Sequence, residues 1–136
     1  MIPDNRYTSR RDKLRKAMKR DKLPAVLICD EINVRYLTGF TGDSTWLLME
    51  RDRETLISDG RFTTQLEEEC PEIPAEIRSV KETLIQASAK MIDRLQVEYC
   101  GFESTAITYD AAAQLEDQVD AVDLLPVKGL VEPLRA

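Results

Sequence analysis

The chain has 136 residues, of which 43% are hydrophobic and 32% are charged. This balance is typical of one globular domain and excludes a disordered chain. The sequence contains no histidine, which excludes every catalytic pair and metal site that needs an imidazole.

The formal net charge of −6 is unevenly distributed, because residues 1–22 hold nine Lys or Arg against three Asp. We interpret this basic segment as the solvated face of a helix whose other face is apolar, and we expect no nucleic-acid partner. No apolar run approaches the roughly 20 residues that a membrane span requires, and the N-terminus has no signal-peptide pattern. We therefore expect a cytoplasmic protein without a membrane partner. Three widely spaced cysteines, Cys29, Cys70 and Cys100, favour a reducing compartment.

The first predicted helix begins at Thr8 or Ser9 and runs to about Lys22, with a weak capping box formed by Ser9 and Asp12. Residues 25–29 form an apolar run of the length and composition of a buried strand. A short helix is expected after the acidic pair Asp30-Glu31 and closes at Gly39.

That short helix carries Ile32, Tyr36 and Leu37 on one face, and Gly39 comes directly after it. Glycine suits the left-handed position after a helix because it has no Cβ. Residues 45–49 and 54–58 then predict two strands of a hairpin around a charged tip.

The remainder alternates between helix and strand. Asp59 is expected to cap a helix over residues 60–69, Thr83 to begin an amphipathic helix, and Thr108 to cap another. Strands are expected at residues 75–80, 97–102 and 120–125, and a final helix or turn at 127–134. This pattern predicts an α/β fold over residues 1–136, with a mixed sheet of five to six strands flanked by helices.

An ordered set of short motifs runs through the chain. Residues 33–40 read Asn-Val-Arg-Tyr-Leu-Thr-Gly-Phe, and residues 59–62 read Asp-Gly-Arg-Phe. Gly-Phe-Glu at 101–103 precedes Ile-Thr-Tyr at 107–109, and residues 125–135 close the set. Together they resemble the N-terminal domain of the creatinase, prolidase and aminopeptidase P family, with Phe62 in place of the usual Tyr.

The resemblance implies a larger parent protein. Its catalytic "pita-bread" domain, absent from this chain, would hold two divalent metal ions, usually manganese, on Asp, His and Glu ligands. The parent would hydrolyse the bond before a proline at the second position through a metal-bound hydroxide. The domain in hand would have no catalytic residues, metal or cofactor of its own. Its implied partners are its own catalytic domain, a second subunit of a homodimer, and short proline-containing peptides, whose length it would limit.

Five residues in the matched motifs are candidates for a substrate wall or a subunit contact. Arg35, Tyr36 and Phe40 could face a peptide or a second subunit, or could belong to a helix packed on the sheet. Asn33 is a further candidate, although asparagine also hydrogen-bonds local backbone at turns. Arg61 could offer its planar guanidinium to a carboxylate at a subunit boundary, or could pair locally beside Asp59.

Other function classes remain open. Asp30, Glu31 and Asp59 at strand ends, with Lys128, resemble the phosphoacceptor site of a receiver domain, but the hairpin before Asp59 replaces the strand–helix–strand unit of that fold. We therefore assign these acids to caps and turns. A stand-alone protein-binding module of the same fold, like those in some histone chaperones, would use the acidic surface to bind basic partners. Creatine is an alternative substrate for the parent.

Overall fold

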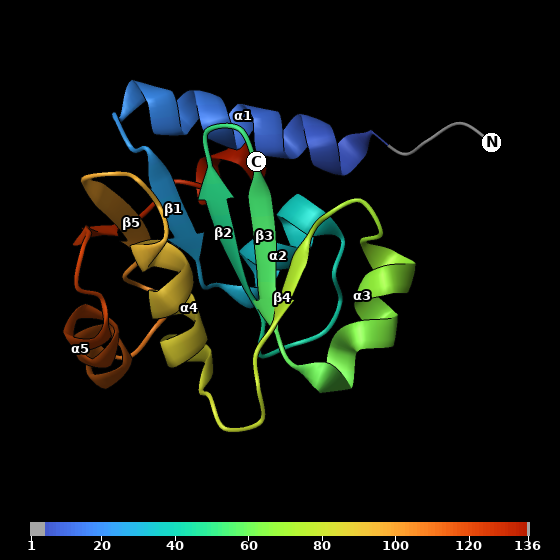
Figure 1. Ribbon diagram of the computed structural model, residues 1–136. Helices are drawn as coiled ribbons and strands as arrows, with labels where there is room; N and C mark the ends of the chain where they lie inside the picture. The colour runs from blue at the N-terminus through green and yellow to red at the C-terminus, as the bar shows by residue number, and fades with distance from the viewer. Residues whose placement is uncertain (1–4, 136) are drawn as a thin grey trace.

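The computed structural model describes residues 5–135, which form a six-stranded mixed sheet covered by helices on both faces (Figure 1). The strand order is β4-β3-β2-β1-β5-β6, and β2 runs antiparallel to both of its neighbours while the other pairs are parallel. The strands are β1 (Ala25–Ile28), β2 (Trp46–Glu50), β3 (Glu54–Ser58), β4 (Ala75–Ile77), β5 (Tyr99–Glu103) and β6 (Asp123–Val127). The predicted α/β class and mixed sheet are confirmed.

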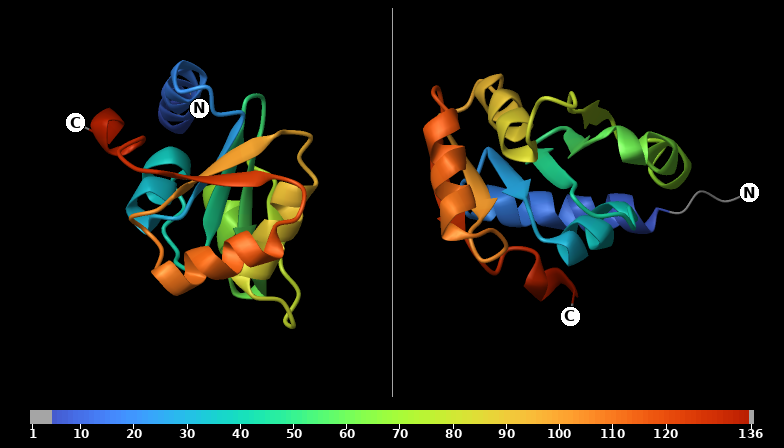
Figure 2. Two further views of the ribbon diagram at one scale, coloured as in Figure 1. Left: turned by 90° about the vertical axis from the view of Figure 1, so that its left-hand side faces the viewer. Right: turned by 90° about the horizontal axis from the view of Figure 1, so that it is seen from below.

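The helices divide between the two faces of the sheet (Figure 2). One face carries α1 (Arg6–Arg20), α2 (Glu31–Thr38), α3 (Thr63–Glu69) and the 3₁₀ turns η1 (Gly60–Phe62) and η2 (Glu132–Arg135). The other face carries α4 (Leu84–Asp93) and α5 (Tyr109–Gln118). Strand β1 is fully buried because Val26 and Ile28 face the first layer while Ala25 and Leu27 face the second.

Side-chain caps fix where several helices begin and end. Thr83 and Gln86 form a reciprocal capping box on α4, and Thr108 accepts a hydrogen bond from the backbone N–H of Ala111 at the start of α5. Asp30 caps α2 in the same way, and Gly39 ends that helix at φ +82°. The predicted caps at Asp59 and Thr108, the predicted helix from Thr83 and the left-handed glycine are therefore confirmed.

Two local predictions were wrong. Helix α1 begins at Arg6, so Ser9 lies inside it, and Asn5 occupies the N-cap without a side-chain cap bond. The Ser9–Asp12 spacing is that of a capping box, but both residues lie inside a helix that begins at Arg6. Ile32 is 63% exposed, because the inner face of α2 is formed by Asn33, Val34 and Leu37 instead.

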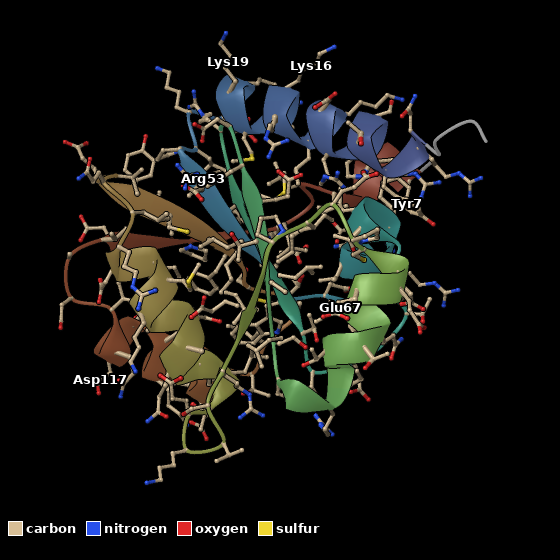
Figure 3. All side chains as sticks on the ribbon, turned by 45° about the vertical axis from the view of Figure 1, so that its right-hand side comes forward. Tyr7, Lys16, Lys19, Arg53, Glu67 and Asp117 are labelled. Atoms are coloured by element: carbon tan, nitrogen blue, oxygen red, sulfur yellow. The ribbon has the colours of Figure 1, made fainter. Side chains whose placement is uncertain are left out.

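Helix α1 is anchored on the hairpin by buried charge. The Arg11 guanidinium, 5% exposed, has its Nε 2.8 Å from Glu54 Oε1 and donates to the carbonyl of Leu37. Arg15 contacts the other oxygen of Glu54 at 2.5 Å. By contrast Lys16 and Lys19 point away from the sheet, so only part of the basic helix is the solvated face that its sequence predicts (Figure 3).

Within residues 5–135, no helix combines the length and apolar character that crossing a membrane requires.

Candidate functional site

A buried carboxylate lies where β1 and β5 end. Glu103, the last residue of β5, is 4% exposed. Its Oε1 accepts hydrogen bonds from the backbone N–H groups of Cys29 at 2.8 Å and Asp30 at 3.0 Å. Its Oε2 accepts a hydrogen bond from Asn33 Nδ2 at 2.6 Å. One carboxylate therefore joins the end of β5 to the turn between β1 and α2.

The same amide reaches the C-terminal segment. Asn33 Nδ2 also donates to Glu132 Oε1 at 2.9 Å, in the turn η2. One helical turn further along α2, the Tyr36 hydroxyl donates to the carbonyl of Leu134 at 2.6 Å. Two side chains of α2 thus hold the last described residues against the domain. We call Asn33, Tyr36, Glu103 and Glu132 the α2–η2 clasp.

The clasp places two carboxyl groups around one amide. Burial raises the pKa of Glu103, and the nearby charge of Glu132 raises it further. The hydrogen bonds from Asp30, Asn33 and Cys29 oppose that rise because they favour the ionised form. Asn33 is fully buried, and its Nδ2 is committed to these internal contacts, whereas its Oδ1 has no hydrogen-bond partner.

The other candidate residues form a second corner. The Phe40 ring is 1% exposed and packs edge-on against Phe62, with ring centroids 5.5 Å apart. The Arg61 guanidinium lies 5.1 Å from the centroid of the Phe62 ring. It also donates two hydrogen bonds of 2.9 Å to Asp59. These hydrogen bonds, with the charge of Arg61, lower the pKa of Asp59 to about 2.

The structure therefore separates the five candidates. Asn33 and Tyr36 meet at the clasp, and Phe40 and Arg61 are linked through Phe62. Arg35 is exposed on the outer side of α2. The isolated domain presents Arg35 and Arg61 at its surface, whereas Asn33 and Phe40 contact other parts of the chain. The roles of all five toward a substrate or a second subunit stay predictions.

A polar hollow of about 470 Å³ opens beside the clasp, at the carboxyl ends of β1 and β5. Cys29, Asp30, Thr45, Trp46 and Thr105 contribute to its lining. This end of the strands is where open α/β sheets bind ligands. Among the residues that the structure describes, no three His, Cys, Asp or Glu side chains come together as metal ligands, so the chemistry of a metal site is not found here.

The receiver-domain alternative has no support in this geometry. Antiparallel β2 separates β1 from β3, so Asp30 and Asp59 come after strands that are not neighbours. Asp30 accepts hydrogen bonds from the N–H groups of Ile32 and Asn33, and Asp59 accepts one from Arg61 N–H. Both acids are helix caps, as assigned from the sequence.

Sequence reasoning missed Glu103 and Glu132 as functional candidates. Both lie in stretches that carried the resemblance, one in Gly-Phe-Glu at the end of a strand and one in the closing segment. A glutamate directly after the apolar residues Cys100, Gly101 and Phe102 was the available signal, since a carboxylate that is buried at a strand end requires donors. Its partner Asn33 could not be identified from spacing because 70 residues separate them.

Comparison with known proteins identifies the family to which this fold belongs. The model of the Creatinase/Prolidase N-terminal domain matches residues 10–136. The chain therefore belongs to the creatinase/prolidase N-terminal domain family. It is 32% identical over 124 residues to the uncharacterized peptidase YqhT of Bacillus subtilis, a match that covers 91% of this chain and 35% of YqhT. The chain thus spans about a third of the length of that curated relative.

Solved structures share the fold. An Xaa-Pro dipeptidase from Bacillus anthracis superposes with a TM-score of 0.86 at 26% identity, over 95% of this chain and 36% of the dipeptidase. The N-terminal domain of the cytoplasmic peptidase PepQ from Mycobacterium tuberculosis gives a TM-score of 0.85 at 34% identity, over 93% of this chain and 98% of that domain.

Proposed function

We propose that this chain is the N-terminal domain of a metal-dependent Xaa-Pro aminopeptidase or Xaa-Pro dipeptidase and has no catalysis of its own. The observation that carries the proposal is the coverage: nearly all of this chain matches about a third of an Xaa-Pro dipeptidase and of a peptidase. The remaining two thirds of the parent polypeptide would carry out the hydrolysis. The family resemblance implies that this part holds two divalent metal ions, usually manganese.

The domain's contribution would be positional. Arg35 and Arg61 are exposed and cationic, and both belong to the motifs that define the resemblance. A guanidinium binds a carboxylate through two parallel hydrogen bonds, so Arg35 suits the C-terminal carboxylate of a short peptide or an acidic group on a second subunit. Arg61 already donates from Nε and Nη2 to Asp59, so it would offer only its remaining donors. Contacts of this kind would limit substrate length and support a homodimer.

The clasp would set the position of the domain relative to the catalytic domain. Asn33 and Tyr36 hold Glu132 and Leu134, the segment that the resemblance places before the catalytic domain. Fixing this segment would keep Arg35, on the same helix, in a constant place relative to the active site. A cytoplasmic location is part of the proposal, supported by the description of PepQ as a cytoplasmic peptidase.

Substrate-length selection is tested in the intact polypeptide that carries this domain. The kcat/KM values for Ala-Pro, Ala-Pro-Ala and a longer Ala-Pro peptide are measured for the native sequence and for Arg35→Ala and Arg61→Ala. We expect at least one variant to change the ratio between long and short substrates by about tenfold, equivalent to about 1.4 kcal/mol. Lys16→Ala, which removes a cation that points away from the sheet, is the matched control. Unchanged ratios in both arginine variants would remove the selection role.

A further inference from the structure

The sheet has an open edge at β4. Within residues 5–135, β4 pairs with β3 on one side and with no strand on the other. Pro74 O accepts from Leu56 N–H, and Arg78 N–H donates to Ser58 O, so these residues and Glu76 between them direct their backbone groups toward β3. Backbone groups alternate along a strand, and those of Ala75 and Ile77 therefore point outward.

A hollow of about 300 Å³ lies next to this open edge, between β4 and α3. Its floor is apolar and comes from Leu66, Ile73, Ala75 and Ile77. Ile77 is 38% exposed there, so part of its side chain is open to solvent. Figure 1 shows α3 beside β4 at the outer side of the sheet. An open strand edge flanked by a helix and an apolar hollow is the arrangement in which an extended peptide adds as another strand.

The charge around the hollow is acidic. Glu67 lines it from the side of α3 that faces β4 (Figure 3), and no Lys or Arg is among its lining residues. Glu68, Glu72 and Glu76 are exposed on the same three segments, namely α3, the following turn and β4. The nearest basic side chain along the strand, Arg78, is engaged with Asp59 at 3.5 Å and with the carbonyl of Glu82.

We propose that the β4–α3 edge binds an extended, basic peptide segment of a partner protein, which adds to β4 as a seventh strand and inserts one apolar side chain into the hollow. Backbone hydrogen bonds to Ala75 and Ile77 give the affinity, the hollow selects an apolar residue, and the surrounding glutamates select lysine or arginine on either side of it. β4 is only three residues long, so the added strand is short and its affinity modest.

The negative charge of the β4–α3 edge also argues against binding of a second copy of this chain at the same edge. A two-fold pairing of β4 with itself would bring the glutamates of α3 and β4 from both copies together, which is unfavourable. The proposal goes beyond the peptidase role, because the segment bound here is not a substrate and needs no proline.

The probe is a fluorescein-labelled nonapeptide of alternating lysine and valine, titrated with the 136-residue chain and monitored by fluorescence anisotropy. The control probe carries N-methyl groups on all its backbone nitrogens, which removes the backbone donors for either strand direction and keeps the charge and side chains. Saturable binding that weakens at least about tenfold on N-methylation is expected. Amide chemical-shift changes should concentrate at Ala75 and Ile77.

Two charge-reversal variants distinguish binding at the hollow from a general attraction between the basic probe and the acidic chain. Glu67→Lys acts at the hollow, whereas Glu116→Lys makes the same change on the exposed face of α5. We expect Glu67→Lys to weaken binding about fivefold more than Glu116→Lys. Equal weakening by both variants, equal binding of the N-methylated probe, or concentration-dependent dimerisation of the chain that protects the β4 amides would each overturn the proposal.

Discussion

Asn33 and Glu103 are 70 residues apart in the sequence, yet Asn33 Nδ2 lies 2.6 Å from Glu103 Oε2 inside the domain. The same Nδ2 lies 2.9 Å from Glu132 Oε1. One amide therefore bridges the end of β5 and the turn η2, and it does so from a helix that begins directly after β1. The topology makes this possible because β1 and β5 are parallel neighbours whose carboxyl ends meet.

The first prediction concerns this bridge. Asn33→Ala leaves Glu103 Oε2 without its side-chain donor in a buried site, so we expect a loss of about 3 kcal/mol in the free energy of unfolding. Urea denaturation of the 136-residue chain measures the change. Asn5→Ala is the matched control, because Asn5 is exposed and makes no side-chain cap bond. A loss at Asn33 no larger than that at Asn5 would show that the bridge does not stabilise the fold.

The second prediction concerns the pH dependence that Glu103 confers. Burial raises its pKa above the ordinary 4.5, so the folded state holds a proton that the unfolded state releases in the interval between the two values. The contribution of Glu103 to stability therefore falls as pH rises from about 4.5 through the folded-state pKa. Urea midpoints of the native sequence and Glu103→Gln are compared from pH 4.5 to 8. The difference between them should change with pH in that direction, and a pH-independent difference would contradict the assignment.

The third prediction concerns Gly39. A Cβ at this position would lie 2.9 Å from two carbons of the Tyr7 ring, and φ is +82°. Gly39→Ala therefore combines a steric clash with left-handed backbone strain, and we expect a destabilisation of about 2 kcal/mol or more. Gly60→Ala is the control, since no heavy atom lies within 4 Å of its Cβ position. Thermal unfolding of the two variants should differ clearly, and similar midpoints would refute the strain argument.

The fourth prediction concerns the cap at Asp59. Its carboxylate accepts a hydrogen bond from Arg61 N–H at the start of η1, so Asp59→Ala should cost about 1 kcal/mol. The Arg61 guanidinium lowers the pKa of Asp59 to about 2, so this contribution is present above about pH 3.8 and disappears as pH falls toward 2. Asp52→Ala, at the exposed hairpin tip, is the comparison. A cost at Asp59 that stays constant down to pH 2 would contradict the assignment.

Local chemistry made much of the fold predictable. Thr83, Thr108, Asp30 and Gly39 mark helix ends because capping depends on residues within one turn of each other. The same approach failed at Ser9, where a capping-box spacing occurs inside a helix that had begun three residues earlier. Sequence spacing identifies a possible cap, but the cap forms only if the helix begins at that residue.

The candidate site was less predictable because its contacts are long-range. The motif around Asn33 and Tyr36 pointed to the right helix, but their partners lie in β5 and η2. Phe40 belongs to the same motif and was predicted as a possible contact, yet its ring lies in the core against Phe62. Neighbouring positions of one motif can have opposite burial, which only the packing of α2 on the sheet determines.

The proposal that this domain belongs to an Xaa-Pro peptidase is tested most directly by the hydrolysis of Ala-Pro by the native polypeptide from source cells. A polypeptide of about 40 kDa, the order expected for two domains, should release free proline when supplied with manganese, while the 136-residue chain alone should release none. A native polypeptide near 15.5 kDa that releases no proline would contradict the claim. The domain would then be a binding module of this fold.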